Sequence, residues 1–180
     1  MDYTLITDPA EAGQALDDIA PVYESVFAEP PYHEGPRDLA LFLETYQREH
    51  KTPGFRLVLA HAADGELVGF AYGLPLSSTT EWWGGFLDTT PTQEFTREDG
   101  QRTFVVKELA VLADQRGHGV GRKLHADLLN GITAERATLT VRPEAPAAAW
   151  YERLGYGLVG HTQPWEGAPV YRTLARPLRA

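Results

Sequence analysis

The spacing of apolar residues in the first part of the chain predicts two amphipathic helices. Leu16, Ile19 and Tyr23 recur at intervals of three and four, which places them on one helical face. A second stripe of this kind lies within residues 37–52. Pro21 falls inside the first stripe, and a proline in a helix removes one hydrogen bond and crowds the preceding turn. We therefore expect Pro21 to interrupt or kink the first helix, so that two shorter helices are possible.

Apolar runs without helical spacing predict the strands. Residues 55–62 and 67–76 flank an Asp-Gly pair at Asp64, which is a strong signal for a β-hairpin. Further strands are expected at residues 2–7, 104–112, 137–141, 156–161 and 170–175, the last two as a closing antiparallel pair, with helices from about Gly119 and over 143–154. The pattern predicts an α/β fold with a mixed, mostly antiparallel sheet flanked by helices.

A long connection separates the hairpin from the next strand. Residues 77–102 carry no clear periodicity, and a connection of this length is usually functional or mobile. It contains two adjacent tryptophans, Trp82 and Trp83. Exposing both would be unfavourable, so they either pack in the core or line a ligand pocket.

Composition narrows the class of protein. The 180 residues are 43% hydrophobic and 23% charged, which suits a single globular domain over residues 1–180. No apolar stretch is long enough to span a membrane, and the N-terminus lacks the layout of a signal peptide. There are no cysteines, so disulfides, thiolate metal sites and cysteine nucleophiles are excluded. We expect a cytoplasmic protein.

The net charge of −9 argues against general nucleic-acid binding, which requires a basic surface. An acidic protein is compatible with a cationic or amine substrate, although acidity also serves solubility. The histidines show no metal-ligand spacing, and we read them as surface or structural residues: His61, His118, His125 and His161.

The expected central strand carries one charge on each of its two apolar faces. Glu108 shares a face with Phe104 and Val106, whereas Lys107 lies on the other. A carboxylate on such a face must be paired, lie near an opening, or have a shifted pKa. Glu108 is therefore either a functional carboxylate or one paired with a nearby cation at the strand end.

A glycine-rich segment follows this strand and leads directly into a helix. Glycines at 117, 119 and 121 allow successive backbone N–H groups to point at one place, and the helix N-terminus adds partial positive charge. Arg116, Arg122 and Lys123 gather here, where cations would normally be unfavourable, so a bound anion such as a pyrophosphate would explain them. The alternative is an ordinary tight turn.

Three segments together resemble the GCN5-related N-acetyltransferase (GNAT) superfamily. Arg116–Gly121 matches its Arg/Gln-x-x-Gly-x-Gly/Ala signature, with Glu108–Val111 before it. Trp150–Tyr156 is similar to the Tyr-Glu-Lys/Arg-Leu-Gly-Phe/Tyr segment of that superfamily. Spacing and order agree over roughly residues 54–175. The resemblance implies a GNAT-type sheet with a splayed central strand.

The resemblance also implies acetyl-CoA as the donor. The strand end would hold the pantetheine arm by its backbone, and the loop N–H groups would cradle the pyrophosphate. The implied cofactor-binding residues are Leu109, Ala110, Val111, Arg116, Gly117, His118, Gly119, Val120, Gly121 and Arg122.

The implied reaction is acetylation of a primary amine. Such an amine must lose a proton before it attacks the thioester, and Glu108 occupies a position where related enzymes often carry the base, acting directly or through water. The oxyanion would be stabilised by a backbone N–H, assigned to Val111. Tyr151 matches the tyrosine that protonates the leaving thiolate, and it can also serve as a core aromatic residue.

The acceptor side is less defined. By the resemblance it would be lined by Tyr32, His33, Tyr72, Trp82 and Trp83. If the two tryptophans line the pocket, they suit a flat or cationic acceptor. Many family members carry an asparagine before the tyrosine helix, where this chain has Glu144 and Ala145. That departure puts one cofactor contact in doubt and leaves Glu144 as a minor candidate for the acceptor side.

Three functions are compatible with these features. The first is an N-acetyltransferase acting on a small-molecule amine, without nucleic acid, membrane or metal, and as a possible homodimer. The second is a non-catalytic acetyl-CoA-binding sensor or interaction module. The third is acetylation of a protein lysine or N-terminus.

Overall fold

The computed structural model describes residues 1–179, and these divide into two compact units that share one strand. Unit 1 comprises Met1–Leu74 and Val106–Gly131, and unit 2 comprises Pro75–Val105 and the described residues from Ile132 onward. Unit 1 contains β1 (Asp2–Ile6), α1 (Pro9–Gln14), α2 (Leu16–Phe27), α3 (Pro36–Glu49), β2 (Arg56–His61), most of β3 (Leu67–Pro75), and α5 (Val120–Leu129). Unit 2 contains α4 (Gln93–Thr96), β5 (Arg136–Val141), α6 (Pro146–Arg153), β6 (Gly157–Thr162) and β7 (Tyr171–Pro177).

The shared strand is β4 (Thr103–Val111), which lies in the middle of the strand order β1-β2-β3-β4-β5-β7-β6. Its pairing with β5 is parallel and covers Thr103, Phe104 and Val105, after which β4 belongs to unit 1. The other registers, β1 with β2, β2 with β3, β5 with β7 and β6 with β7, are antiparallel. The predicted mixed, mostly antiparallel sheet with a splayed central strand is confirmed, as are the hairpin and the closing antiparallel pair.

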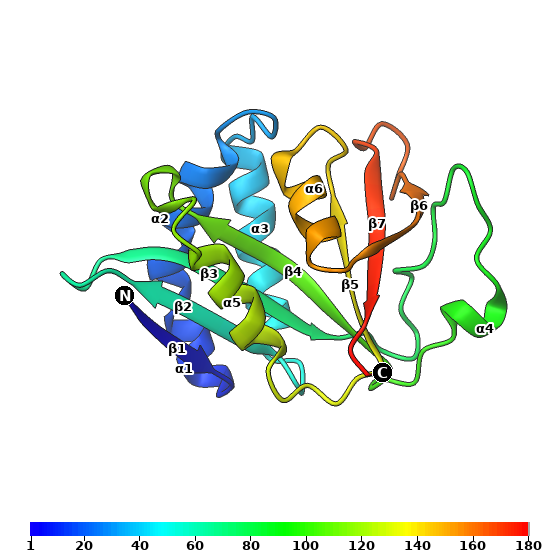
Figure 1. Ribbon diagram of the computed structural model, residues 1–180, viewed down its shortest axis with the longest axis horizontal. Coiled ribbons are helices and arrows are strands. Elements are labelled where there is room, and N and C mark those ends of the chain that lie inside the picture. The colour runs from blue at the N-terminus through cyan, green and yellow to red at the C-terminus, as the bar shows by residue number, and fades with distance from the viewer. Residues whose placement is uncertain (180) are drawn as a thin grey trace. The chain divides into compact units, whose positions relative to one another are not determined.

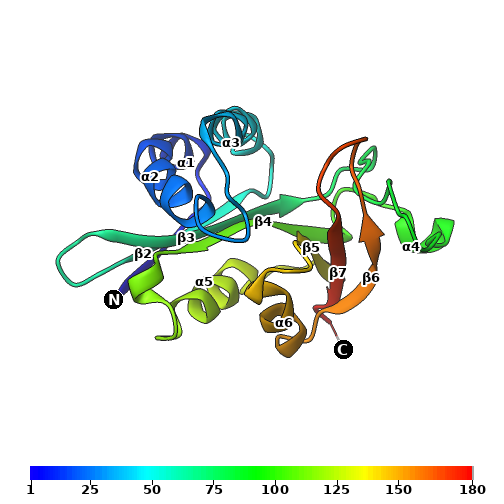
Figure 2. The same cartoon turned by 90° about the horizontal axis from the view of Figure 1, so that it is seen from above.

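Unit 1 has helices on both faces of its strands (Figures 1 and 2). Helices α1, α2 and α3 cover one face, and α5 covers the other. The core on the first face is aromatic, with Tyr23 stacked on Phe42 at 3.9 Å between ring centroids and Tyr46 edge-on to Tyr72 at 5.2 Å. These rings bury large apolar areas, which fixes the helices against the strands that carry the candidate site.

The first helical segment divides at Ala15 and not at Pro21, which corrects the expectation that the proline interrupts it. Asp8 caps α1 by accepting from the N–H groups of Ala10 and Glu11. Pro21 lies within α2, and the carbonyl that loses its hydrogen bond belongs to exposed Asp17. That carbonyl remains accessible to water, so the buried face of α2 keeps the helix continuous.

The long connection in unit 2 is more ordered than its sequence suggests. It contains the four-residue helix α4, which the pattern does not predict, and Phe86 forms an isolated bridge with Thr162 of β6. α6 begins at Pro146, later than the expected residue 143. Within residues 1–179, no helix combines the length and apolar character needed to cross a membrane.

Candidate active site

The glycine loop in unit 1 forms a cradle of unused hydrogen-bond donors. Gly117 and Gly119 have φ values of 80° and 85°, a left-handed conformation that favours glycine at both positions. The N–H groups of residues 117–122 donate to no acceptor in the part of the chain that the structure describes. No side chain caps α5 at Gly119. Consecutive free donors at the start of a ten-residue helix suit an anion, so this chain's loop fits a pyrophosphate.

The cations at this loop are less available than their clustering predicts. Lys123 is paired with Asp127 one turn along α5. The guanidinium of Arg116 donates from Nε to the carbonyl of Val111 at 2.8 Å and from Nη1 to Glu29 Oε2 at 2.7 Å. Arg122 is exposed, and no hydrogen bond or ion pair joins its side chain to another described residue. The attraction for an anion therefore arises from the backbone and Arg122. A bound anion was expected to explain all three cations, but it is needed to explain only Arg122.

The strand end before the loop lies against β3. The N–H of Leu112 donates to the carbonyl of Val68 at 2.9 Å. A Cβ added to Gly69 would lie 2.8 Å from the carbonyl oxygen of Ala110, so only glycine permits this approach of the two backbones. Ala110 and Val111 have buried side chains, which leaves their backbone groups as the means by which they could hold a ligand.

Glu108 is a carboxylate whose surroundings resist its ionisation. Its side chain is only partly accessible, and no hydrogen bond or ion pair joins its carboxylate to another of residues 1–179. Burial raises the pKa of Glu108 to about 8; Lys107 opposes the shift, and the nearby carboxylates of Glu34 and Glu49 add to it. The alternative of a carboxylate neutralised by a nearby cation is not what the structure favours, because Lys107 forms its ion pair with Glu49 Oε1 at 3.0 Å.

Two tyrosines hold the neighbouring carboxylates. Tyr23 donates its hydroxyl to Glu34 Oε2 at 2.6 Å, and Tyr72 donates to Glu49 Oε2 at 2.9 Å. Burial raises the pKa of both tyrosines, and the charge of Glu108 raises each further, so both hydroxyls lie near its carboxyl. Both tyrosines therefore remain neutral donors throughout the physiological range. We call Glu34, Glu49 and Glu108 the carboxylate cluster.

The predicted acceptor residues of unit 1 have different environments. Tyr72 is 1% exposed, so it orients Glu49 and has almost no surface of its own with which to touch a ligand. Tyr32 is partly buried and packs edge-on against Phe27 at 5.0 Å. His33 is exposed with φ of 51°, an uncommon conformation for a residue other than glycine.

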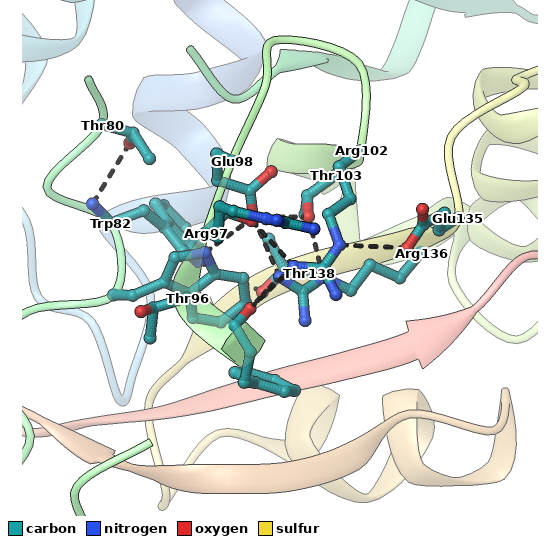
Figure 3. A network of polar contacts seen from close by, with 12 residues as sticks. Thr80, Trp82, Thr96, Arg97, Glu98, Arg102, Thr103, Glu135, Arg136 and Thr138 are labelled. Carbon is teal, nitrogen blue, oxygen red and sulfur yellow. Dashed lines mark hydrogen bonds and ion pairs between the residues drawn. The ribbon is translucent and has the colours of Figure 1, made fainter. Parts of the chain in front are cut away.

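In unit 2, Trp83 belongs to a buried polar network that fixes the long connection. Figure 3 labels three other members of this network, Glu98, Thr103 and Arg136. The indole N–H of Trp83 donates to Glu98 Oε1 at 2.8 Å, and the guanidinium of Arg136 pairs with the same oxygen at 2.9 Å. Thr103 Oγ1 is a third donor to that oxygen, at 2.7 Å. Trp83 is 7% exposed. Of the two alternatives, core packing and pocket lining, its burial supports core packing.

Trp82 is more accessible than Trp83, and its indole N–H donates to Thr138 Oγ1 at 3.2 Å. Arg136 lies over the rings of Trp83 and Phe95, at 4.7 and 4.3 Å from their centroids. These contacts attach the connection to the first residues of β4 and β5.

Tyr151 is a packed aromatic residue of unit 2. It is 8% exposed and lies edge-on to Trp150 and Tyr156, with ring centroids 4.8 and 5.6 Å apart. This is its expected packing role, and its role as the proton donor stays a prediction.

Two residues replace the family's asparagine. Ala145 is buried, whereas Glu144 is exposed, and its Oε1 lies 3.7 Å from Nη1 of Arg142.

Sequence reasoning missed the partners of the predicted residues. Glu34, Glu49, Tyr23 and Glu29 come from α2, α3 and the turn between them, and no motif marks them. The only available signal was the position of Glu29 and Glu34 in the same short loop as Tyr32 and His33.

The Glu98–Arg136 ion pair had no signal in the sequence, because 38 residues separate its members.

A sequence profile of the acetyltransferase (GNAT) family matches residues 18–156, which is most of the chain. The chain belongs to the GNAT acetyltransferase family. The family uses acetyl-CoA, and its members are acyltransferases. Among curated proteins, no match was found.

Solved structures support the GNAT fold. One is a GNAT acetyltransferase, described as putative, from Desulfovibrio desulfuricans, with 17% identity, a TM-score of 0.67 and 99% coverage of both chains. Another is aminoglycoside 6'-acetyltransferase type Ii, with 18% identity, a TM-score of 0.68 and coverage of 100% of this chain and 99% of that one. A third is the NatC complex bound to Gag peptide and CoA, with 14% identity, a TM-score of 0.61 and coverage of 99% and 100%.

Proposed function

We propose that this GNAT protein transfers an acetyl group from acetyl-CoA to a primary amine of a small molecule, with Glu108 as the proton acceptor. The observation that carries the proposal is the placement of Glu108 beside Glu34 and Glu49 while Lys107 pairs with Glu49, surroundings that raise the pKa of Glu108 to about 8. A carboxylate with such a pKa accepts a proton from an ammonium group far more readily than an ordinary glutamate does.

The charges around Glu108 favour an amine acceptor. An ammonium group entering the cluster would be attracted by Glu34 and Glu49 and would lower the cost of ionising Glu108. The proton then passes from the ammonium to the Glu108 carboxylate, directly or through water, and the neutral amine attacks the thioester carbonyl. The carbon–nitrogen bond forms as the carbon–sulfur bond breaks, and the departing thiolate takes up a proton, for which Tyr151 is the proposed donor. The second proton that the nitrogen loses on becoming an amide restores the Tyr151 hydroxyl through water.

The donor side rests on the backbone. Residues 117–122 offer free N–H groups to the pyrophosphate, and Leu109–Val111 would hold the pantetheine arm, with the Val111 N–H as the proposed oxyanion donor. Bound acetyl-CoA supplies the activated acetyl group. Within residues 1–179, no group of three or more metal-binding side chains is placed to hold an ion, and a metal-free reaction stays a prediction.

Small molecules and proteins are the two acceptor classes to be distinguished. Two structural neighbours illustrate the choice, since one is named for aminoglycosides and the other was solved with a peptide. We favour a small molecule because Tyr23 and Tyr72 hold the two carboxylates next to Glu108 in fixed positions, which suits a compact charged acceptor. Homodimer formation and a cytoplasmic location stay predictions.

Release of CoA thiol in the presence of an amine library tests the proposal. The chain has no cysteine, so a thiol reagent reports CoA alone. We expect kcat to rise with pH through an apparent pKa of about 8, and Glu108→Gln to lower kcat by about 100-fold or more and remove that rise. Tyr151→Phe should lower kcat if Tyr151 protonates the thiolate.

Glu44→Gln is the matched control, because Glu44 is exposed on α3 and lies outside the cluster. Acetyl-CoA binding without turnover of any amine would favour the sensor. Turnover of peptides but not of small amines would favour a protein acceptor. Unchanged turnover in Glu108→Gln would remove Glu108 from the mechanism.

A further inference from the structure

The side chain of Arg116 joins three segments of unit 1 that are far apart in the sequence. It leaves the start of the glycine loop and reaches back to the end of β4, where Nε donates to the carbonyl of Val111 at 2.8 Å. Its Nη1 pairs with Oε2 of Glu29, in the turn that follows α2, at 2.7 Å. One guanidinium thus contacts the strand end and the α2–α3 turn at the same time.

Glu29 in turn organises the residues after it. Its main-chain carbonyl accepts from the N–H of Tyr32 at 3.0 Å and from the N–H of His33 at 3.2 Å. The turn then continues into Glu34, whose N–H donates to the carbonyl of Phe27 at 2.9 Å. Fixing Glu29 therefore fixes the turn that carries two predicted acceptor residues and one member of the carboxylate cluster.

The two-armed geometry requires arginine. A guanidinium presents donors in a fixed fork, so it can bond a carbonyl and a carboxylate at once, whereas a lysine ammonium is a single point charge. The Arg116 and Glu29 side chains are 44% and 35% exposed, so an ion pair alone would contribute little. The bond from Nε to the Val111 carbonyl restrains the side chain and lowers the entropy cost of forming the ion pair.

We propose that Arg116 is a positioning residue whose guanidinium acts through Glu29 to hold the α2–α3 turn against the donor end of the site. In this assignment the pyrophosphate is held by backbone N–H groups, and the Arg116 side chain serves the acceptor side. The assignment relies on the proposed function for its meaning in catalysis, but the contact itself can be tested without turnover.

Amide hydrogen exchange at Tyr32 and His33 is the direct test, because both N–H groups donate to the Glu29 carbonyl. We expect Arg116→Gln and Glu29→Gln each to accelerate their exchange by about three- to tenfold. The double variant should exchange no faster than either single variant, because the two side chains act as one unit. Arg116→Lys should resemble Arg116→Gln, since it keeps the charge but loses the fork.

Affinity for CoA, measured by calorimetry, separates this role from direct binding of the pyrophosphate. We expect Glu29→Gln to change the Kd for CoA by no more than about twofold. A change of about tenfold would correspond to the loss of a whole charged contact with CoA. Glu29→Gln also keeps the bond between Arg116 and Val111, so it remains informative if Arg116→Gln destabilises the protein. Glu24→Gln, an exposed change of the same kind on α2, is the control and should leave exchange unchanged.

If an amine substrate is found, the acceptor KM should rise several-fold in Glu29→Gln while the apparent affinity for acetyl-CoA is kept. If no amine is turned over, the exchange and CoA measurements still decide the assignment. Unchanged exchange at Tyr32 and His33 in both single variants would overturn it. So would a loss of CoA affinity above about tenfold in Arg116→Gln with no effect of Glu29→Gln.

Discussion

Two glutamates, one in each unit, show how the same side chain can serve opposite purposes. Glu98 in unit 2 has a side chain that is 1% exposed, and its Oε1 accepts from Trp83, Thr103 and Arg136. Glu108 in unit 1 is partly accessible and lies beside two other carboxylates, and its pKa is raised to about 8. Burial depth alone therefore does not identify the reactive group. What distinguishes the two glutamates is the number of hydrogen-bond donors that contact each carboxylate.

The network around Glu98 also has one unsatisfied atom. Glu98 Oε2 is buried and has no hydrogen-bond partner among the described residues. The carboxylate thus depends strongly on the donors at Oε1 and on the charge of Arg136, whose side chain is 10% exposed. Removing that charge should be costly, whereas changes around Glu108 should alter chemistry and pH dependence more than folding.

The largest stability effect is expected from Arg136→Met. It leaves the Glu98 carboxylate buried without its cation, so the free energy of unfolding should fall by about 3–5 kcal/mol, which corresponds to a Tm lower by about 10 °C. Chemical and thermal denaturation measure both. Arg97→Met, at an exposed position of the same connection, should change stability by less than about 0.5 kcal/mol. Below its melting range, the Arg136→Met variant should keep the wild-type pH dependence of turnover. A shifted pH profile would contradict the view that Glu98 serves folding and Glu108 serves chemistry.

A smaller and pH-dependent effect is expected at Glu108. Its pKa is about 8 in the folded protein and near 4.5 when unfolded, so the folded state binds more protons between these values. The contribution of Glu108 is most favourable below pH 4.5 and is lost as the pH rises through 8. Glu108→Gln should therefore match the wild type near pH 5 and exceed it in stability at pH 8–9.

Denaturant titrations of both proteins at several pH values measure this difference, in which all other titrating groups cancel. A constant difference between the two proteins from pH 5 to 9 would show that Glu108 is not desolvated as described. The stability would then give no support to its role as a base.

The smallest effect is expected from removing one hydroxyl. Tyr72→Phe deletes the donor to Glu49 and should lower stability by about 1 kcal/mol. Tyr46→Phe is the matched control, because the Tyr46 hydroxyl is also buried but donates to the Ala12 carbonyl, away from the cluster. Both variants should lose similar stability, while only Tyr72→Phe should raise the acceptor KM. Equal effects on KM would mean that Tyr72 supports the fold but does not organise the cluster.

Local features could be predicted because local chemistry determines them. The hairpin at Asp64 and the helix start near Gly119 each depend on a few adjacent residues, and each is confirmed. The division at Ala15 was missed, because whether a proline ends a helix depends on what the opposite face packs against.

The candidate site divides in the same way. The sequence by itself determined the central strand with Glu108, the glycine loop and the family, because these follow from periodicity and a contiguous motif. Only the tertiary structure decided that Glu34 and Glu49 surround Glu108, that Arg116 is committed to Glu29, and that Trp83 is held by Glu98. The physical reason is that charge interactions and desolvation depend on distance in space, and residues separated by tens of positions meet only after the chain has folded.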